Sequence, residues 1–109
     1  MTERADFARV RKHGRSAPGR FLVMATLPDA ALTGLKIGII TSRKVGKAVV
    51  RNKVRRRLRS IVSKHGERIE SPRLIVMVAR HRAGEATFQQ LEHDWLRLAD
   101  RLGVLQKPE

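Results

Sequence analysis

Apolar residues recur at helical spacing between residues 48 and 64. A helix over this segment would carry four of them on one side, at intervals of four, four and three positions: Val50, Val54, Leu58 and Ile61. At 1.5 Å per residue this helix would be about 25 Å long. Its opposite side would carry only polar residues: Asn52, Arg56, Arg59 and Ser63. We therefore expect a helix that packs inward along its apolar stripe and presents a basic face outward.

The last helical segment begins with a capping signal. Thr87 and Gln90 have the spacing of a capping box. The apolar residues that follow repeat every three or four positions up to the helix breaker Gly103: Phe88, Leu91, Trp95, Leu98 and Leu102. This stripe indicates that Trp95 is a core residue and not a base-stacking one.

A third, shorter helix is expected near the start of the chain, over residues 3–12. Thr2 is its candidate N-cap, and Gly14 ends it. Phe7 and Val10 fall on one side of this helix. A lone aromatic residue on such a helix ordinarily packs in the core, so that interpretation of Phe7 stays open beside any binding role.

Short apolar runs predict the strands. Residues 21–27 lie between Pro-Gly and Pro-Asp pairs, and residues 35–41 form a second run. The connection over residues 29–34 is short enough for an antiparallel hairpin, in which Gly34 would supply an unusual backbone angle. Residues 74–79 are the clearest strand, and we expect it at the centre of the sheet.

These elements define an α+β fold. The predicted order is α-β-β-α-β-α, a sandwich of one small sheet and its helices. A chain of 109 residues is long enough for one real core and too short for a second, so a single domain is expected over residues 1–109.

The charge of the chain is large and unevenly distributed. Twenty-four Lys and Arg stand against ten Asp and Glu, a formal net charge of +14. Residues 1–64 hold 17 of the basic residues and 3 of the acids, whereas residues 65–109 hold 7 of each. One surface therefore carries the charge, and its expected partner is a polyanion.

The densest basic stretch is residues 43–64, with ten Lys and Arg and no acid. Like charges four residues apart destabilise a helix by a few tenths of a kcal/mol per pair, and bound phosphates would relieve this repulsion. A solvated basic face is the alternative, but such faces usually include acids as well. Neutralising about six phosphates would make log K fall with log salt at a slope of roughly −4 to −5.

Other kinds of site find little support in the sequence. There is no cysteine, no apolar run of about 20 residues and no signal-peptide pattern, which favours a cytoplasmic protein. The four histidines have no metal-ligand spacing, and no phosphate-binding glycine loop or serine elbow is present. A hydrolase that works alone, with its own metal site, is therefore not expected.

Residues 45–59, VGKAVVRNKVRRRLR, resemble the signature of bacterial ribonuclease P proteins. In that family a hydrophobic residue, an Ala and an Arg-Asn-basic-aliphatic-basic-Arg run occur in this order, with a further basic residue beyond them. The resemblance continues in shorter motifs around this segment: Asp6-Phe7, Lys12-His13-Gly14, Ser42-Arg43-Lys44 and Val78-Ala79-Arg80. It covers most of the chain.

The resemblance implies a protein subunit that does not cleave RNA itself. A larger catalytic RNA would hold the Mg²⁺ ions, with no dedicated site on the protein, and would remove the 5′ leader of precursor tRNA. No obligate protein partner and no membrane is implied. The family fold also has a left-handed βαβ crossover through the motif helix, against the usual right-handed rule.

Two sets of binding residues follow from the resemblance. The first would contact the catalytic RNA: Arg43, Lys44, Lys47, Arg51, Asn52, Lys53, Arg55, Arg56, Arg57 and Arg59. The second would line a cleft for the single-stranded leader, between the first helix, the sheet and the motif helix: Phe7, Arg11, Phe21, Val23 and Ala25.

The chain departs from the family pattern at a few of these positions. Lys53 stands where Arg is commoner, and Lys47 where Asn often caps the helix. Arg11 and Ala25 replace aromatic residues of the family cleft, and stacking on an aromatic is worth about 1–3 kcal/mol per base. Arg11 would have to compensate through its planar guanidinium or a phosphate contact.

Other functions remain as alternatives to be tested. A ribosomal or RNA-chaperone protein would share the basic helix but would bind mixed RNA. A DNA-binding regulator would show a sequence preference in duplex DNA, although no helix-turn-helix is suggested by the pattern. A nuclease that acts without RNA would cleave in the presence of metal alone.

Overall fold

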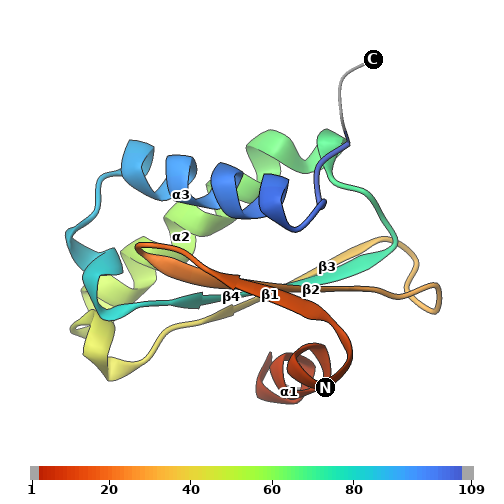
Figure 1. Cartoon of the computed structure of the whole chain (residues 1–109). Coiled ribbons are helices and arrows are strands. Elements are labelled where there is room, and N and C mark those ends of the chain that lie inside the picture. The colour runs from red at the N-terminus through yellow and green to blue at the C-terminus, as the bar shows by residue number, and fades with distance from the viewer. Residues whose placement is uncertain (1–2, 107–109) are drawn as a thin grey trace.

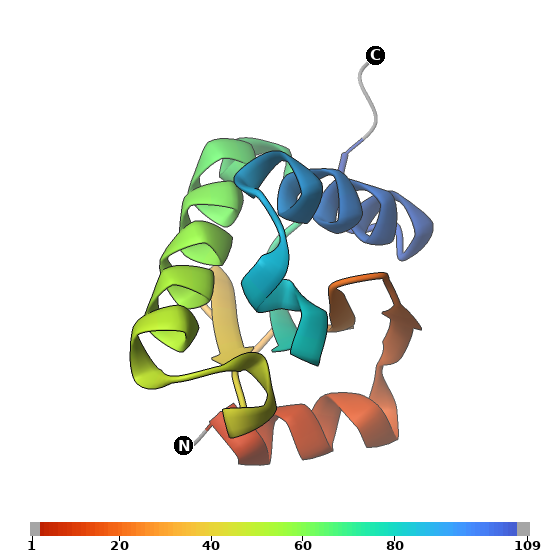
Figure 2. The same ribbon diagram turned by 90° about the vertical axis from the view of Figure 1, so that its left-hand side faces the viewer.

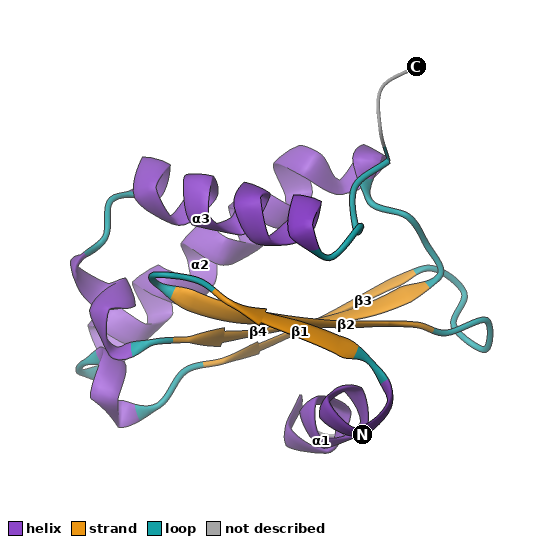
Figure 3. Ribbon diagram, in the orientation of Figure 1, coloured by secondary structure: helices purple, strands orange, loops and turns teal. Residues whose placement is uncertain are grey.

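The computed structural model describes residues 3–106, in which one sheet separates helices on its two faces (Figure 1). The helices are α1 (Glu3–His13), α2 (Ala48–His65) and α3 (Phe88–Arg101). The strands are β1 (Arg15–Pro18), β2 (Leu22–Pro28), β3 (Leu35–Ile40) and β4 (Arg73–Ala79). Three short 3₁₀ helices connect them: η1 (Arg43–Val45), η2 (Gly66–Arg68) and η3 (His81–Glu85). Figure 3 shows α2 and α3 on one face of the sheet and α1 on the other.

The strands lie in the order β1-β2-β4-β3. β4 is antiparallel to β2, with Leu22 opposite Ala79, and parallel to β3, with Leu35 opposite Arg73. The predicted central position of β4 is confirmed. The predicted hairpin between β2 and β3 is wrong, because β4 lies between them. β4 is buried along nearly its whole length, as expected for a central strand whose two faces are both covered by helices.

β1 was not expected from the sequence. It has four residues, of which only Ala17 is buried, so it lacks the apolar alternation that identifies a strand. It pairs antiparallel with β2, from Arg15 opposite Thr26 to Pro18 opposite Val23, and forms one edge of the sheet.

The crossover from β3 through α2 to β4 is left-handed. β3 and β4 are parallel, and Figures 1 and 2 show the chain passing over the α3 side of the sheet between them. This sense agrees with the family fold implied by the sequence and departs from the common right-handed rule.

Two apolar clusters fill the space on either side of the sheet. The main core lies between the sheet and the pair α2 and α3, and includes Leu22, Met24, Val54, Leu58, Ile61, Ile75, Met77, Leu91, Trp95 and Leu98. A small cluster under α1 contains Val10, Ala25, Leu74 and Val76. The buried position of Trp95 and the capping box of Thr87 and Gln90 confirm the helix predicted there.

The N-terminal helix ends where the sequence predicts. α1 ends at His13, next to Gly14 as expected, while its candidate cap Thr2 lies outside the described residues. No helix within residues 3–106 is long and apolar enough to cross a membrane.

Candidate nucleic-acid interface

The outer face of α2 carries exposed basic residues. Val54, Leu58 and Ile61 are buried, which fixes the rotation of the helix. The predicted outward residues are all exposed: Asn52, Arg56, Arg59 and Ser63. Val49, 78% exposed, adds an apolar side chain near the start of this face that the sequence analysis did not single out.

Two shallow hollows run along this face. One, of about 480 Å³, is lined by Asn52, Arg55, Arg56, Arg59, Ser60 and Ser63. The other, of about 220 Å³, is lined by Thr41, Ala48, Arg51, Asn52 and Arg55. They share Asn52 and Arg55, so the surface is continuous from the end of β3 to the last turn of α2. Its dimensions suit a polynucleotide backbone rather than a small enclosed ligand.

The Nε atoms of two arginines at the edge of this surface differ in their partners. The Nε of Arg55 donates to the Thr41 hydroxyl at 3.0 Å, which orients the guanidinium beside the smaller hollow. The Nε of Arg51 is buried without a hydrogen-bond partner. A buried donor without an acceptor costs roughly 1–3 kcal/mol, so a phosphate oxygen that reached it would be favoured.

The structure divides the predicted RNA-binding set. Arg57 turns away from the outer face and donates from Nη1 to the carbonyl of Ala86 at 2.8 Å, tying α2 to the segment before α3. Lys53 lies one turn earlier, on the same flank as Arg57. The structure therefore brings Arg51, Asn52, Arg55, Arg56 and Arg59 together and leaves these two residues to the side.

The charge on α2 is almost unopposed by acids. Among the cations of residues 43–64, all of which are described, only Lys64 forms an ion pair, with Glu92 at 2.9 Å. The Lys64 ammonium, followed by His65, lowers the pKa of the Glu92 carboxyl by hydrogen bonding to it. That pair lies at the far end of the helix, so the potential of the outer face is not neutralised by the protein.

The basic surface extends past the N-terminus of α2. Arg43, Lys44 and Lys47 are exposed there, and η3 packs beside them. Arg80, just before η3, and His81 and Arg82 within it are exposed, as is the acid Glu85. Figure 2 looks onto this end of the molecule. Sequence reasoning found Arg80 only as part of a family tripeptide and missed Arg82, since charge periodicity does not reveal that η1 and η3 are neighbours.

Part of the predicted leader cleft forms on the other face of the sheet. Phe7 is half-buried against the small cluster under α1, and the Arg11 guanidinium carbon lies 5.7 Å from the centre of its ring. Arg11 is exposed, and Val23 on β2 is half-buried on the same side of the sheet. These three residues remain reachable by a ligand.

Ala25 and Phe21 do not belong to that accessible surface. Ala25 has no exposed surface and lies in the cluster with Val10. Phe21 is 6% exposed and packs in the main core, on the opposite face. The alternation that placed it beside Val23 fails because the strand begins only at Leu22, after a turn whose amides bond to Asp94 on α3.

A protein-held metal would need a set of ligands, and the described residues do not provide one. Within residues 3–106 there is no group of three or more His, Cys, Asp or Glu that could hold an ion.

Comparisons with known proteins identify the family of the chain. The model of the Ribonuclease P family matches residues 1–103. The ribonuclease P protein component of Syntrophomonas wolfei is 31% identical over 94% of this chain and 85% of that protein. That of Thermus thermophilus is 44% identical over 92% of this chain, which spans 57% of the longer relative. The structure of the Staphylococcus aureus RNase P protein has a TM-score of 0.87 at 29% identity, covering 97% of this chain and 96% of that one.

Proposed function

Because the chain belongs to the ribonuclease P protein family, which serves 5′ maturation of tRNA, we propose that it binds the catalytic RNA of that enzyme through α2. The observation that supports this most is the outer face of α2, where exposed arginines have no acidic partner. Arginine binds a phosphate through two parallel hydrogen bonds, and Asn52 both donates and accepts toward a sugar or base. The contact region is Arg51, Asn52, Arg55, Arg56 and Arg59, extended by Arg43, Lys44 and Lys47.

In this proposal the protein takes part in an endoribonuclease without performing the cleavage. The RNA subunit and substrate hold Mg²⁺, which supplies metal-assisted hydrolysis of a phosphodiester. The protein neutralises phosphates close to the RNA active site and so strengthens the binding of substrate and metal. The cytoplasm is the proposed location, since precursor tRNA and the RNA subunit would be met there.

We further propose that the α1 face binds the 5′ leader of precursor tRNA. Phe7 and the Arg11 guanidinium over its ring offer a planar surface to an unpaired base. Val23 adds an apolar contact beside them. Replacing Arg11 by Ala should weaken the binding of precursor tRNA several-fold and leave mature tRNA unchanged in the same assay. An equal loss for both RNAs would contradict a leader contact.

Reconstitution with a bacterial ribonuclease P RNA tests the main proposal. At near-physiological Mg²⁺ the protein should accelerate leader removal, and the double variant Arg51→Glu with Arg56→Glu should abolish that acceleration. The control is Arg68→Glu with Arg101→Glu, which lowers the net charge equally at exposed sites elsewhere. No acceleration by the unmodified protein, or equal loss in both double variants, would refute the proposal.

The same preparation distinguishes the ribosomal or RNA-chaperone alternative. Sequencing RNA that copurifies with the protein should return one dominant species under the present proposal. A mixture of ribosomal and messenger RNA would favour the alternative instead.

A further inference from the structure

A separate hollow of about 390 Å³ lies between the β1–β2 turn and α3. It is lined by Arg20, Phe21, Gln89, Gln90, His93, Asp94 and Arg97. In Figure 2 the outer face of α2 and this turn lie on opposite sides of the molecule. The hollow is therefore distinct from both the α2 surface and the α1 face.

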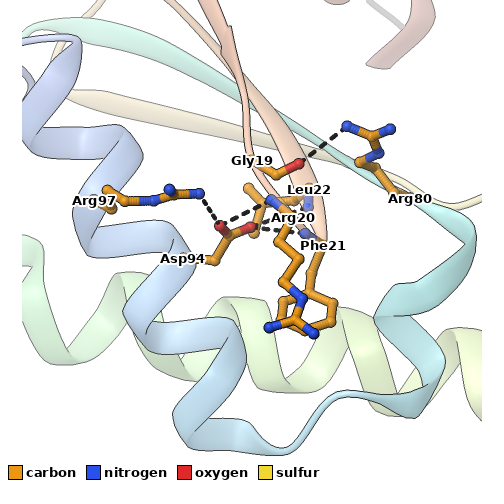
Figure 4. A network of polar contacts seen from close by, with 7 residues as sticks. All are labelled: Gly19, Arg20, Phe21, Leu22, Arg80, Asp94 and Arg97. Atoms are coloured by element: carbon orange, nitrogen blue, oxygen red, sulfur yellow. Dashed lines mark hydrogen bonds and ion pairs between the residues drawn. The ribbon is translucent and has the colours of Figure 1, made fainter.

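A buried carboxylate makes the wall of this hollow rigid. Asp94, 3% exposed, accepts hydrogen bonds from the backbone N–H groups of Arg20 at 3.0 Å, Phe21 at 2.9 Å and Leu22 at 3.3 Å (Figure 4). On the other side of the turn, Arg80 donates from Nη1 to the Gly19 carbonyl at 3.0 Å. The turn is held from both sides before any ligand binds.

The approach of Asp94 to the turn also demands glycine at position 19. A Cβ there would lie 2.5 Å from Oδ2 of Asp94, closer than real contacts allow. The turn and α3 are thus fitted to one another at the floor of the hollow.

The side chains at its rim are donors and planar groups. The Arg20 guanidinium carbon lies 5.2 Å from the centre of the Phe21 ring, and Figure 4 shows Arg20 extended across that ring. Arg97 donates to Asp94 at 3.0 Å, yet its side chain remains 60% exposed. Gln89 and His93 are exposed beside them. The oxygens of Asp94 already accept four hydrogen bonds, so the rim is cationic towards a ligand.

We propose that this hollow binds one unpaired nucleotide of an RNA strand. The base stacks on the outer side of the Arg20 guanidinium, which Phe21 supports from beneath. Its edge is within the reach of Gln89 and His93, which can each donate and accept hydrogen bonds. The free part of the Arg97 guanidinium meets the phosphate.

The chemistry of the rim favours RNA over a protein partner. Phe21 is the single apolar side chain of the lining and is nearly buried, so little apolar area is available for a protein contact. The inference rests on the proposed function for the identity of the partner. It adds that the RNA must reach around the molecule, because α2 and this hollow lie on different sides.

Binding of the catalytic RNA by paired variants tests the inference. Arg20→Ala and Arg101→Ala remove the same charge from exposed positions, but only Arg20 lines the hollow. Fluorescence titration of labelled ribonuclease P RNA should show about tenfold weaker binding for Arg20→Ala, within the range known for loss of one stacked base. Gln89→Ala, which removes only an exposed amide, should weaken binding about twofold to fivefold, as expected for one lost hydrogen bond. Arg101→Ala should stay close to the unmodified protein.

A photo-crosslinking residue placed at position 89 provides a second measurement. It should attach to a single region of the RNA, different from the region attached by the same residue at position 56. If Arg20→Ala and Gln89→Ala bind as well as Arg101→Ala, or no crosslink forms at position 89, the nucleotide site is refuted while the α2 proposal stands. If the unmodified protein shows no preference for this RNA over other polyanions, the proposed function itself fails.

Discussion

Asp94 connects two parts of the chain that are 72 to 74 residues apart. Its carboxylate is the acceptor for three consecutive amides that have no strand partner at the start of β2. Replacing it by Ala would leave the amides of Phe21 and Leu22 buried without an acceptor, at roughly 1–3 kcal/mol for each, and would also remove the part-buried contact of the Arg20 amide. We expect Asp94→Ala to lower the free energy of unfolding by about 3 kcal/mol or more, measured by urea denaturation. Asp94→Asn keeps one acceptor oxygen and should lose clearly less; equal losses would show that the amides are not what Asp94 stabilises.

Glu92 gives the stability a dependence on pH. Hydrogen bonds first from Lys64 and then from His65 lower the pKa of its carboxyl in the folded state. A lowered pKa means that this stabilisation is present above the unfolded value of about 4.3 and is lost as the pH falls through the folded value. Glu92→Gln should therefore reduce stability at pH 7 by under about 1 kcal/mol.

The pH profile separates the charge of Glu92 from its packing. The difference between Glu92→Gln and the unmodified protein should shrink as the pH falls below about 4.3, in urea titrations at a series of pH values. A difference that stays constant down to about pH 3 would mean that the carboxylate charge contributes nothing.

The helix α2, which presents the basic surface, packs closely against η3 near its N-terminus. A Cβ at Gly84 in η3 would lie 2.7 Å from Cγ1 of Val50 and 2.8 Å from the Val45 carbonyl oxygen. We expect Gly84→Ala to push η3 away from α2 and to destabilise the fold by about 1–3 kcal/mol, the usual cost of overpacking. Thermal unfolding followed by circular dichroism measures this.

Gly66→Ala is the matched control, because a Cβ at Gly66 meets nothing within 4 Å. Its helical backbone accepts alanine, so it should unfold at the same temperature as the unmodified protein or slightly above it. Equal destabilisation by the two variants would contradict a packing role for Gly84.

Helices were predicted well from the sequence because their signals are local. The stripe from Val50 to Ile61 and the capping box at Thr87 depend only on residues three or four positions apart. Strand pairing is not local. The loop between β2 and β3 is short enough for a hairpin, yet β4, which comes later in the chain, lies between them.

In the candidate site, too, features set by neighbouring residues were predictable, and features set by contacts between distant residues were not. The outer face of α2 follows from the helix period, and the structure confirms the exposure of Asn52, Arg56 and Arg59. The inward turn of Arg57 depends on a carbonyl 29 residues away, and the burial of Phe21 depends on Asp94. Neither partner is adjacent in sequence, so no periodicity could have shown these contacts.

Over the whole molecule, the unpaired basic residues and the ion pairs occupy different places. The surface without acids lies on the outer face of α2 and on η1, and the following ion pairs lie outside it: Arg9 with Asp29, Lys64 and His65 with Glu92, Arg73 with Glu70, and Arg97 with Asp94. With a net charge of +14, the folded protein concentrates like charges that the unfolded chain would spread apart. Anions that bind this surface should therefore stabilise the fold.

A ligand that binds only the folded state, present at about one hundred times its dissociation constant, stabilises by about 2.7 kcal/mol. For a domain of about 100 residues this corresponds to a rise in Tm of roughly 10–20 °C.

Phosphate should therefore raise the Tm of the protein well above its value in chloride at matched ionic strength. Phosphate also stabilises proteins in general by exclusion from their surface, so the informative quantity is the difference between the unmodified protein and the double variant Arg51→Glu with Arg56→Glu. The variant should keep the general effect and lose most of the rest, because its outer face no longer collects anions. Equal increases in Tm for both proteins would mean that the arginines of α2 do not form an anion-binding surface in the absence of RNA.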